Sequence, residues 1–147
     1  MLSLQEMSDR IEIQDLMTRY AYAIDDRDWA ALDRVFTPDA VIDYSDMGGS
    51  KGDLPSTKRF LAEAMPNFPA FQHLSATTQI KLDGDSAAAR TILFNPMVME
   101  HEGAPRVFFI GLWYNDTLVR TPEGWRISAR REQKSWSYNA PPGLLPE

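Results

Sequence analysis

The sequence predicts an α+β fold, in which N-terminal helices cover one face of a curved antiparallel sheet. Helical patterns dominate the first 65 residues, whereas four long stretches with strand character follow between residues 72 and 137. The turn sequences DGD, HEGAP and TPEG separate these stretches. A strongly curved sheet wrapped around its helices would form a cone with an apolar cavity. We find no internal repeat or linker, so a single domain over residues 1–147 is expected.

The first helix is expected from about residue 4 to residue 26. The stretch SLQE, from Ser3 to Glu6, has the form of a capping box, a reciprocal hydrogen-bonding pattern at helix N-termini. Apolar residues then recur at helical spacing and define an inner face: Ile13, Met17, Tyr20, Ala21 and Ile24. At ~100° per residue, Asp25 lies just past the edge of this face, whereas Asp26 points toward solvent.

Two further helices and a short strand are expected before Pro66. Asp28 has the position of an N-cap for a second helix, WAALDRVF, which turns inward Trp29, Leu32, Val35 and Phe36. TPDA indicates a turn, and AVIDYS a strand that carries on one face Ala40, Ile42 and Tyr44. The glycines of MGGSKGD indicate a loop, and a third helix, STKRFLAEAM, ends at the proline.

The remaining sequence predicts an antiparallel meander, with strands at about residues 72–82, 86–100, 105–119 and 125–137. In the third of these strands one face carries Val107, Phe109 and Trp113, and the other carries Phe108, Ile110, Leu112 and Tyr114. Because both faces are apolar, we expect helices on one and a partner subunit on the other, in a homodimer or homotrimer. The segment at about 138–147, YNAPPGLLPE, is expected to be an extended arm that docks on another surface.

Composition excludes several classes of function. The chain has 15 Lys and Arg against 21 Asp and Glu, and this net charge of -6 has the wrong sign for binding nucleic acid or an anionic membrane. There is no cysteine, which excludes disulfides, thiol nucleophiles and cysteine-ligated zinc. The N-terminus lacks the apolar core of a signal peptide, so a cytoplasmic location is expected. MGGSKGD lacks the residue spacing of a phosphate-binding loop, so no nucleotide is expected.

Only His73 and His101 are available for imidazole chemistry. His101 lies in the turn MEHEGAP and is expected in solvent. His73 opens the first long strand, on a polar face that either meets water or forms the floor of a pocket roofed by the first helix. In the second case Asp25 could reach His73, fix its tautomer and stabilise its imidazolium, making the pair a general base. In the first case Asp25 is simply a solvated acid at a helix end. One histidine with one carboxylate is too few ligands for a metal site.

The order of elements, together with YAIDDRDWAALDRVFTPDAVIDY, FQHLSATT and GWRISARR, resembles the SnoaL-like branch of the NTF2-like superfamily. The scytalone dehydratase-like and hexachlorocyclohexane dehydrochlorinase-like members are the most similar, over about residues 5 to 140. The resemblance implies an α+β barrel of conical shape. In dehydratase-like members an aspartate near the end of the first helix and a histidine opening the first long strand form the catalytic dyad, and Asp25 and His73 match these positions.

The resemblance implies three further site residues. Tyr44, in VIDYS, matches a tyrosine with which scytalone dehydratase binds its substrate carbonyl through water. Tyr20 matches a tyrosine found five residues before the aspartate in bile-acid dehydratase-like relatives. Arg130, in WRISARR, resembles an arginine beside the leaving group in the dehydrochlorinase and bile-acid dehydratase relatives. Strict strand alternation would instead turn Arg131 inward, unless a bulge intervenes.

The chain also departs from scytalone dehydratase. The second catalytic histidine of that enzyme falls near Phe94 here, and Ile24 stands where it has a tyrosine, so its substrate and its acid step are not carried over. Pockets in this fold are lined by apolar side chains, and the expected substrate pocket consists of Ile24, Phe94, Met97, Phe109 and Trp113. The alternative for these residues is ordinary core packing.

Together these residues favour a cofactor-independent lyase, most simply a dehydratase, acting on a small aromatic or polycyclic hydroxylated substrate. His73 would remove a proton from carbon with Asp25 behind it, Tyr20 and Tyr44 would bind the oxygen that gains negative charge, and Arg130 would assist the leaving group. An isomerase, a polyketide-type cyclase and a non-catalytic small-molecule-binding module are alternatives on the same scaffold.

Overall fold

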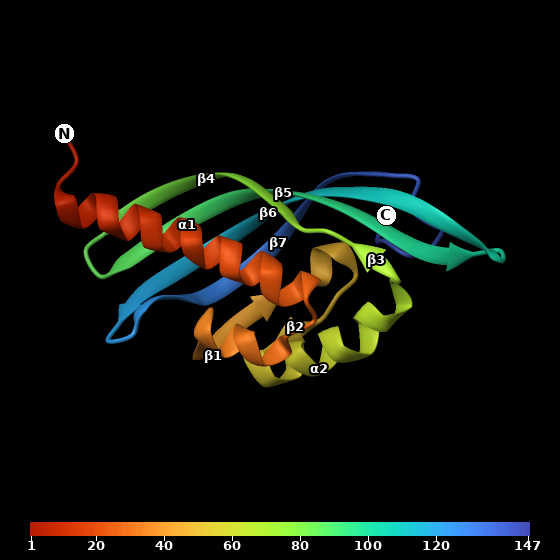
Figure 1. Cartoon of the computed structure of the whole chain (residues 1–147), viewed down its shortest axis with the longest axis horizontal. Helices are drawn as coiled ribbons and strands as arrows, with labels where there is room; N and C mark the ends of the chain where they lie inside the picture. The colour runs from red at the N-terminus through yellow and green to blue at the C-terminus, as the bar shows by residue number, and fades with distance from the viewer.

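The computed structural model describes residues 1–147 and has its two α-helices on one side of a curved sheet (Figure 1). Helix α1 spans Leu4–Asp25 and runs along the long strands, and α2 spans Leu54–Ala64 and packs beside β1 and β2. Three short 3-10 helices complete the helical part, namely η1 (Trp29–Arg34), η2 (Ser45–Met47) and η3 (Met65–Asn67). The strands are β1 (Phe36–Asp43), β2 (Lys51–Gly52), β3 (Ala70–Phe71), β4 (Leu74–Asp83), β5 (Ser86–His101), β6 (Ala104–Thr121) and β7 (Gly124–Tyr138).

The sheet has the order β2-β1-β7-β6-β5-β3, and β4 also pairs with β5. The α+β class and the antiparallel meander from β4 to β7 are confirmed. Two expectations about the sheet are wrong: it is mixed, because β1 lies parallel to β7, and it stays open instead of closing into a barrel. β1 and β7 are far apart in the sequence and no hairpin joins them, so they are not forced to be antiparallel.

Helix α1 agrees with its expected bounds to within one residue, because its signals are local. Ser3 and Glu6 form the complete capping box. The second helix is shorter than expected: Asp28 does cap it through Ala31, but its six residues form the 3-10 helix η1. TPDA, expected as a turn, lies inside β1, whose pairing with β7 is irregular at this point.

Bulges bend the long strands around the helices. The pairing of β4 with β5 shifts between Ser75 and Thr78, and the pairing of β6 with β7 shifts at Gly111 and again at Thr117. In the last case Thr117 pairs with Ala129 and the next residue of β6 pairs with Ile127, so Ser128 has no partner. Each extra residue increases the local twist and changes which side chains point inward.

The sheet has one covered face and one open face. The alternation of side chains along β6 was predicted correctly. The helices, however, cover the face that carries Phe108, Ile110 and Leu112. The assignment of three side chains to the pocket is therefore wrong: Phe94, Phe109 and Trp113. On the outer face Phe94 packs against Phe109, with ring centroids 5.5 Å apart, and against Trp136 at 6.0 Å. The guanidinium of Arg90 covers Trp113.

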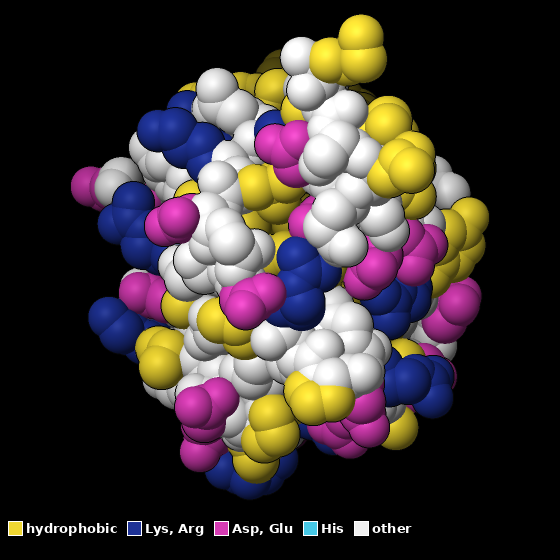
Figure 2. All heavy atoms as spheres, turned by 90° about the vertical axis from the view of Figure 1, so that its left-hand side faces the viewer, with side chains coloured by type: hydrophobic (Ala, Val, Ile, Leu, Met, Phe, Trp, Pro, Cys, Tyr) yellow, Lys and Arg dark blue, Asp and Glu magenta, His cyan; other side chains and the backbone are white.

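The C-terminal arm folds back onto its own domain. Leu144 and Leu145 reach the space between the helices and the sheet, and the ammonium of Lys134 donates to the carbonyl of Pro146 at 2.7 Å. Figure 2 views the opposite end of the molecule, where acidic and basic side chains are interspersed and neither histidine is visible. None of the helices has the length and apolar character needed to cross a membrane.

Candidate active site

A cavity of about 330 Å³ lies between the helices and the inner face of the sheet. Sixteen of its 22 lining residues are hydrophobic, a composition suited to an apolar ligand the size of one or two rings. Ile24 and Met97 line it, as expected from the sequence. Polar groups come from two tyrosines counted among these sixteen, Tyr20 and Tyr44, and from four other side chains: Asn67, His73, Asn95 and Glu132.

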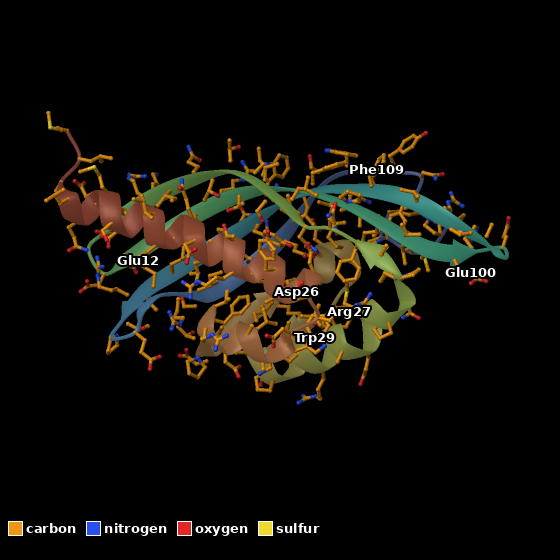
Figure 3. All side chains as sticks on the ribbon, viewed as in Figure 1. Glu12, Asp26, Arg27, Trp29, Glu100 and Phe109 are labelled. Atoms are coloured by element: carbon orange, nitrogen blue, oxygen red, sulfur yellow. The ribbon has the colours of Figure 1, made fainter.

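Asp25 and His73 are in direct contact at one wall of this cavity. Asp25 is the last residue of α1 and His73 lies just before β4. The imidazole Nδ1 is 2.7 Å from Asp25 Oδ1, and the backbone N–H of His73 donates to the same carboxylate at 3.0 and 3.1 Å. A carboxylate held in this way favours a proton on Nδ1 and leaves Nε2 as the free acceptor. The neighbouring Asp26 is the exposed C-cap of α1, beside Arg27 (Figure 3).

His73 is the member of the pair that meets the cavity. Its side chain is 9% exposed and lines the cavity, whereas the side chain of Asp25 is 25% exposed and lies behind it. The bulge after Ser75 interrupts the alternation of side chains along β4. Before the bulge His73 points into the cavity, and the next residue, Leu74, points outward and is exposed. Of the two sequence interpretations of His73, the polar face in water and the pocket floor, the second describes its position.

Tyr20 and Tyr44 form a buried hydroxyl pair in the same cavity. Their oxygens are 2.6 Å apart, and the residues are 2% and 4% exposed. Burial raises the pKa of both phenols, so both are neutral hydrogen-bond donors at physiological pH. The MGGSKGD loop holds Tyr44 in place, because the backbone of Gly49 passes so close that an added Cβ would lie 2.7 Å from Tyr44 Cβ.

Arg130 does not line the cavity. The bulge at Ser128 turns it inward and leaves Arg131 exposed, but its guanidinium is bound twice by Asp116, at 2.7 and 2.8 Å. It is stacked between the rings of Tyr20 and Tyr114, 4.1 and 3.9 Å from their centroids. Burial opposes the charge, but Asp116 outweighs it and raises the pKa of Arg130. The guanidinium therefore contacts the face of the Tyr20 ring that points away from the cavity.

Three polar residues of the lining were not identified from the sequence, namely Asn67, Asn95 and Glu132. Asn95 is buried and donates from Nδ2 to the carbonyl of Gln72 at 2.7 Å, which anchors the segment that carries His73. Glu132 is the inward neighbour of Arg130 on β7. A signal for Glu132 was available, because the family resemblance implied an inward Arg130, and strand alternation then turns inward the residue two positions later.

Comparisons with known proteins agree with this architecture. Residues 5–131 match the model of the SnoaL-like domain. The uncharacterized protein Rv2910c of Mycobacterium tuberculosis is 50% identical over 134 residues, which cover 91% of this chain and 90% of that protein. A solved structure described as a candidate scytalone dehydratase from Novosphingobium aromaticivorans has a TM-score of 0.79 at 17% identity, covering 91% of this chain and 89% of the other.

A further solved structure is a hexachlorocyclohexane dehydrochlorinase, LinA-type3, from Novosphingobium barchaimii. It has a TM-score of 0.81 at 16% identity and covers 93% of each chain. At such identities the two solved structures support the fold alone, whereas the family match extends over most of the sequence. With helices laid on a curved open sheet and a match from residue 5 to residue 131, this chain belongs to the SnoaL-like domain family.

Proposed function

We propose that this protein is a cofactor-independent lyase that removes water, or a related leaving group, from a small aromatic or polycyclic hydroxylated compound. The observation that carries the proposal is the 2.7 Å contact between Asp25 and His73 at the wall of an apolar cavity. A carboxylate held against one imidazole nitrogen orients the ring and stabilises its protonated form, which suits the other nitrogen to general-base catalysis. The dehydratase and dehydrochlorinase among the structural neighbours make elimination the simplest use of such a base.

The reaction begins when Nε2 of His73 takes a proton from a carbon next to a carbonyl group. The electron pair of the broken C–H bond moves toward the carbonyl, and its oxygen gains negative charge. Within the Tyr20–Tyr44 pair one hydroxyl donates to the other, and the remaining O–H donates a hydrogen bond to that oxygen. The pair then forms the carbon–carbon double bond as the C–O bond breaks, and the proton held by His73 passes to the departing hydroxide, which leaves as water. Asp25 stabilises the transient imidazolium throughout.

Arg130 contributes from behind the Tyr20 ring instead of contacting the leaving group. A cation on the face of a phenol makes its hydroxyl a stronger hydrogen-bond donor, since it stabilises the phenolate form. The nearby Arg130 accordingly counteracts the effect of burial on the Tyr20 pKa. Charge developing on the substrate oxygen would be stabilised through Tyr20, without a direct contact to the guanidinium.

The test uses the variants His73→Ala and Asp25→Asn with a panel of hydroxylated aromatic ketones and mass detection of dehydrated products. Loss of a positioned general base is expected to lower turnover by about 10²–10⁴-fold, with ligand affinity largely kept. His101→Ala is the matched control, since His101 ends β5 away from the cavity lining, and it should retain full activity. Turnover retained in His73→Ala would show that another base acts. Ligands released unchanged by the wild-type protein would identify a binding module instead.

A further inference from the structure

Glu132 is the one acidic side chain in the lining of the cavity. It lies on β7 opposite Tyr114 of β6, at the end of the cavity lined by the Tyr20–Tyr44 pair. A carboxylate in apolar surroundings normally recruits a cation or several N–H donors, because an unpaired buried charge is costly. The carboxyl of Glu132 has neither: no side-chain or backbone donor bonds to it, and no ammonium, guanidinium or imidazole lies within 4.0 Å of it.

The cations on the same strand are engaged elsewhere. Arg130 is held by both oxygens of Asp116, and Lys134 donates to the carbonyl of Pro146. Neither forms an ion pair with Glu132, although the charge of Arg130 acts on it from a longer distance. The remaining titratable groups around it come from four elements: Tyr20 on α1, Asp43 on β1 with Tyr44 just after it, Asp46 on η2 and Tyr114 on β6.

These neighbours favour the neutral form of the carboxyl. Burial, with Asp43 and Asp46 adding to it and Arg130 opposing, raises the pKa of Glu132 to about 8. The three tyrosines have raised pKa values and stay neutral across this range. The side chain is partly exposed at the cavity wall, and its neutral form, favoured near pH 7, offers an O–H to a ligand.

We propose that Glu132 is a substrate-binding residue whose protonated carboxyl donates a hydrogen bond to a neutral oxygen of the ligand, a carbonyl or a hydroxyl, beside the Tyr20–Tyr44 pair. The idea that this oxygen belongs to the reacting ketone rests on the proposed function, but the binding site itself does not. Once ionised, Glu132 loses its donor and presents a negative charge to the ligand oxygen. The site thus selects neutral ketones and phenols and binds them more weakly as the pH rises through the Glu132 pKa.

The test compares 1-tetralone, a neutral bicyclic ketone, with tetralin, which has the same rings and no oxygen. Calorimetric titrations run from pH 6 to pH 9.5. The wild-type affinity for 1-tetralone should fall by about thirtyfold between pH 7 and pH 9.5, in proportion to the protonated fraction of the site. Glu132→Gln keeps a donor and removes the titration, so its affinity should be independent of pH. Glu132→Leu should bind the ketone weakly at every pH, and tetralin binding should be flat in all three proteins.

A second measurement uses the wild-type protein alone. At pH 8.5, 1-tetralone binding should take up a fraction of a proton, seen as a binding enthalpy that changes with the ionisation enthalpy of the buffer. No ketone binding at pH 6, a pH-independent wild-type affinity, or the same slope in Glu132→Gln would overturn the proposal. His73→Ala separates the two ideas: it should keep the pH dependence of binding while losing turnover, so failure of either proposal can be recognised without the other.

Discussion

Two carboxyl groups, those of the buried Asp9 and of Glu132, which is partly buried at the cavity wall, are held in opposite ways. Asp9, near the start of α1, accepts hydrogen bonds from two nitrogens of Arg120 at 2.6 and 2.8 Å, from Trp125 at 3.0 Å and from Gln5 at 2.9 Å. Glu132 accepts none. The hydrogen bonds from Arg120 hold the pKa of Asp9 well below its usual range, whereas burial raises that of Glu132 to about 8.

The difference separates a structural carboxylate from one that can serve a ligand. Asp9 ties α1 to β6 and β7 and has no hydrogen-bonding capacity left for anything else. Glu132 lowers the stability of the folded state when it is ionised, because its charge is unpaired. Its neutral carboxyl keeps an unused donor and acceptor in the cavity. Unused capacity of this kind is typical of functional sites.

The largest effect is expected from Asp9→Asn. It removes the charge that pairs with Arg120 and should lower the free energy of unfolding at pH 7 by about 3 kcal/mol. Because the folded pKa of Asp9 is depressed, this stabilisation is present above the ordinary pKa of 3.8 and is lost as the pH falls below it. Asp9 stays ionised in the folded protein well below that value, so thermal unfolding should show the full difference between variant and wild type at pH 7 and a smaller one at pH 3.

Asp85→Asn is the matched control for this change. Asp85 also binds Arg120, at 2.9 Å, but its side chain is 87% exposed. An exposed ion pair contributes little, so the control should fall within about 1 kcal/mol of wild type. Equal losses of unfolding free energy in the two variants would mean that burial does not strengthen the contribution of the Asp9–Arg120 pair.

The second-largest effect is expected from Glu132→Gln, which should stabilise the protein where Asp9→Asn destabilises it. Glu132 changes its pKa from an ordinary 4.5 to about 8 on folding, so the folded state binds the proton more tightly and stability falls as the pH rises between these values. Glu132→Gln does not titrate and should unfold at a higher temperature than wild type at pH 9. The gain should be about 2 kcal/mol, less than the ~5 kcal/mol that the whole shift would give, because the side chain is partly exposed, and it should vanish near pH 4. Glu123→Gln, at an 85% exposed site near the β6–β7 turn, should show no such trend. A pH-independent difference for Glu132→Gln would contradict the raised pKa.

The contrast also shows how far the sequence reaches. The capping box and the apolar period predicted α1 to within one residue, because both signals depend on neighbours along the chain. Strand alternation predicted correctly that Phe108 and Phe109 face opposite ways, but it could not say which face the helices cover. Which face is covered depends on long-range packing, and for this reason Phe109 was wrongly assigned to the pocket.

The site was predictable only in part for a related reason. Spacing alone could not bring together Asp25 and His73, which are 48 positions apart, and the resemblance to a family supplied the pairing. The bulge at Ser128 decided that Arg130 rather than Arg131 points inward, and with it the orientation of Glu132. A bulge depends on the fit between two strands, so neither strand reveals it by itself.

The smallest effect is expected at the hydroxyl pair that neighbours Glu132. Tyr44→Phe removes one hydroxyl and leaves Tyr20 with a buried O–H and no partner, which should cost about 1 kcal/mol of unfolding free energy. The double variant with Tyr20→Phe removes both polar groups and should be close to the single variant in stability, because no hydroxyl is then left unpaired. Tyr22→Phe, at a 66% exposed position on α1, serves as the control and should be neutral. Strictly additive losses in the double variant would mean that the 2.6 Å contact carries no coupling, and that each hydroxyl acts on its own.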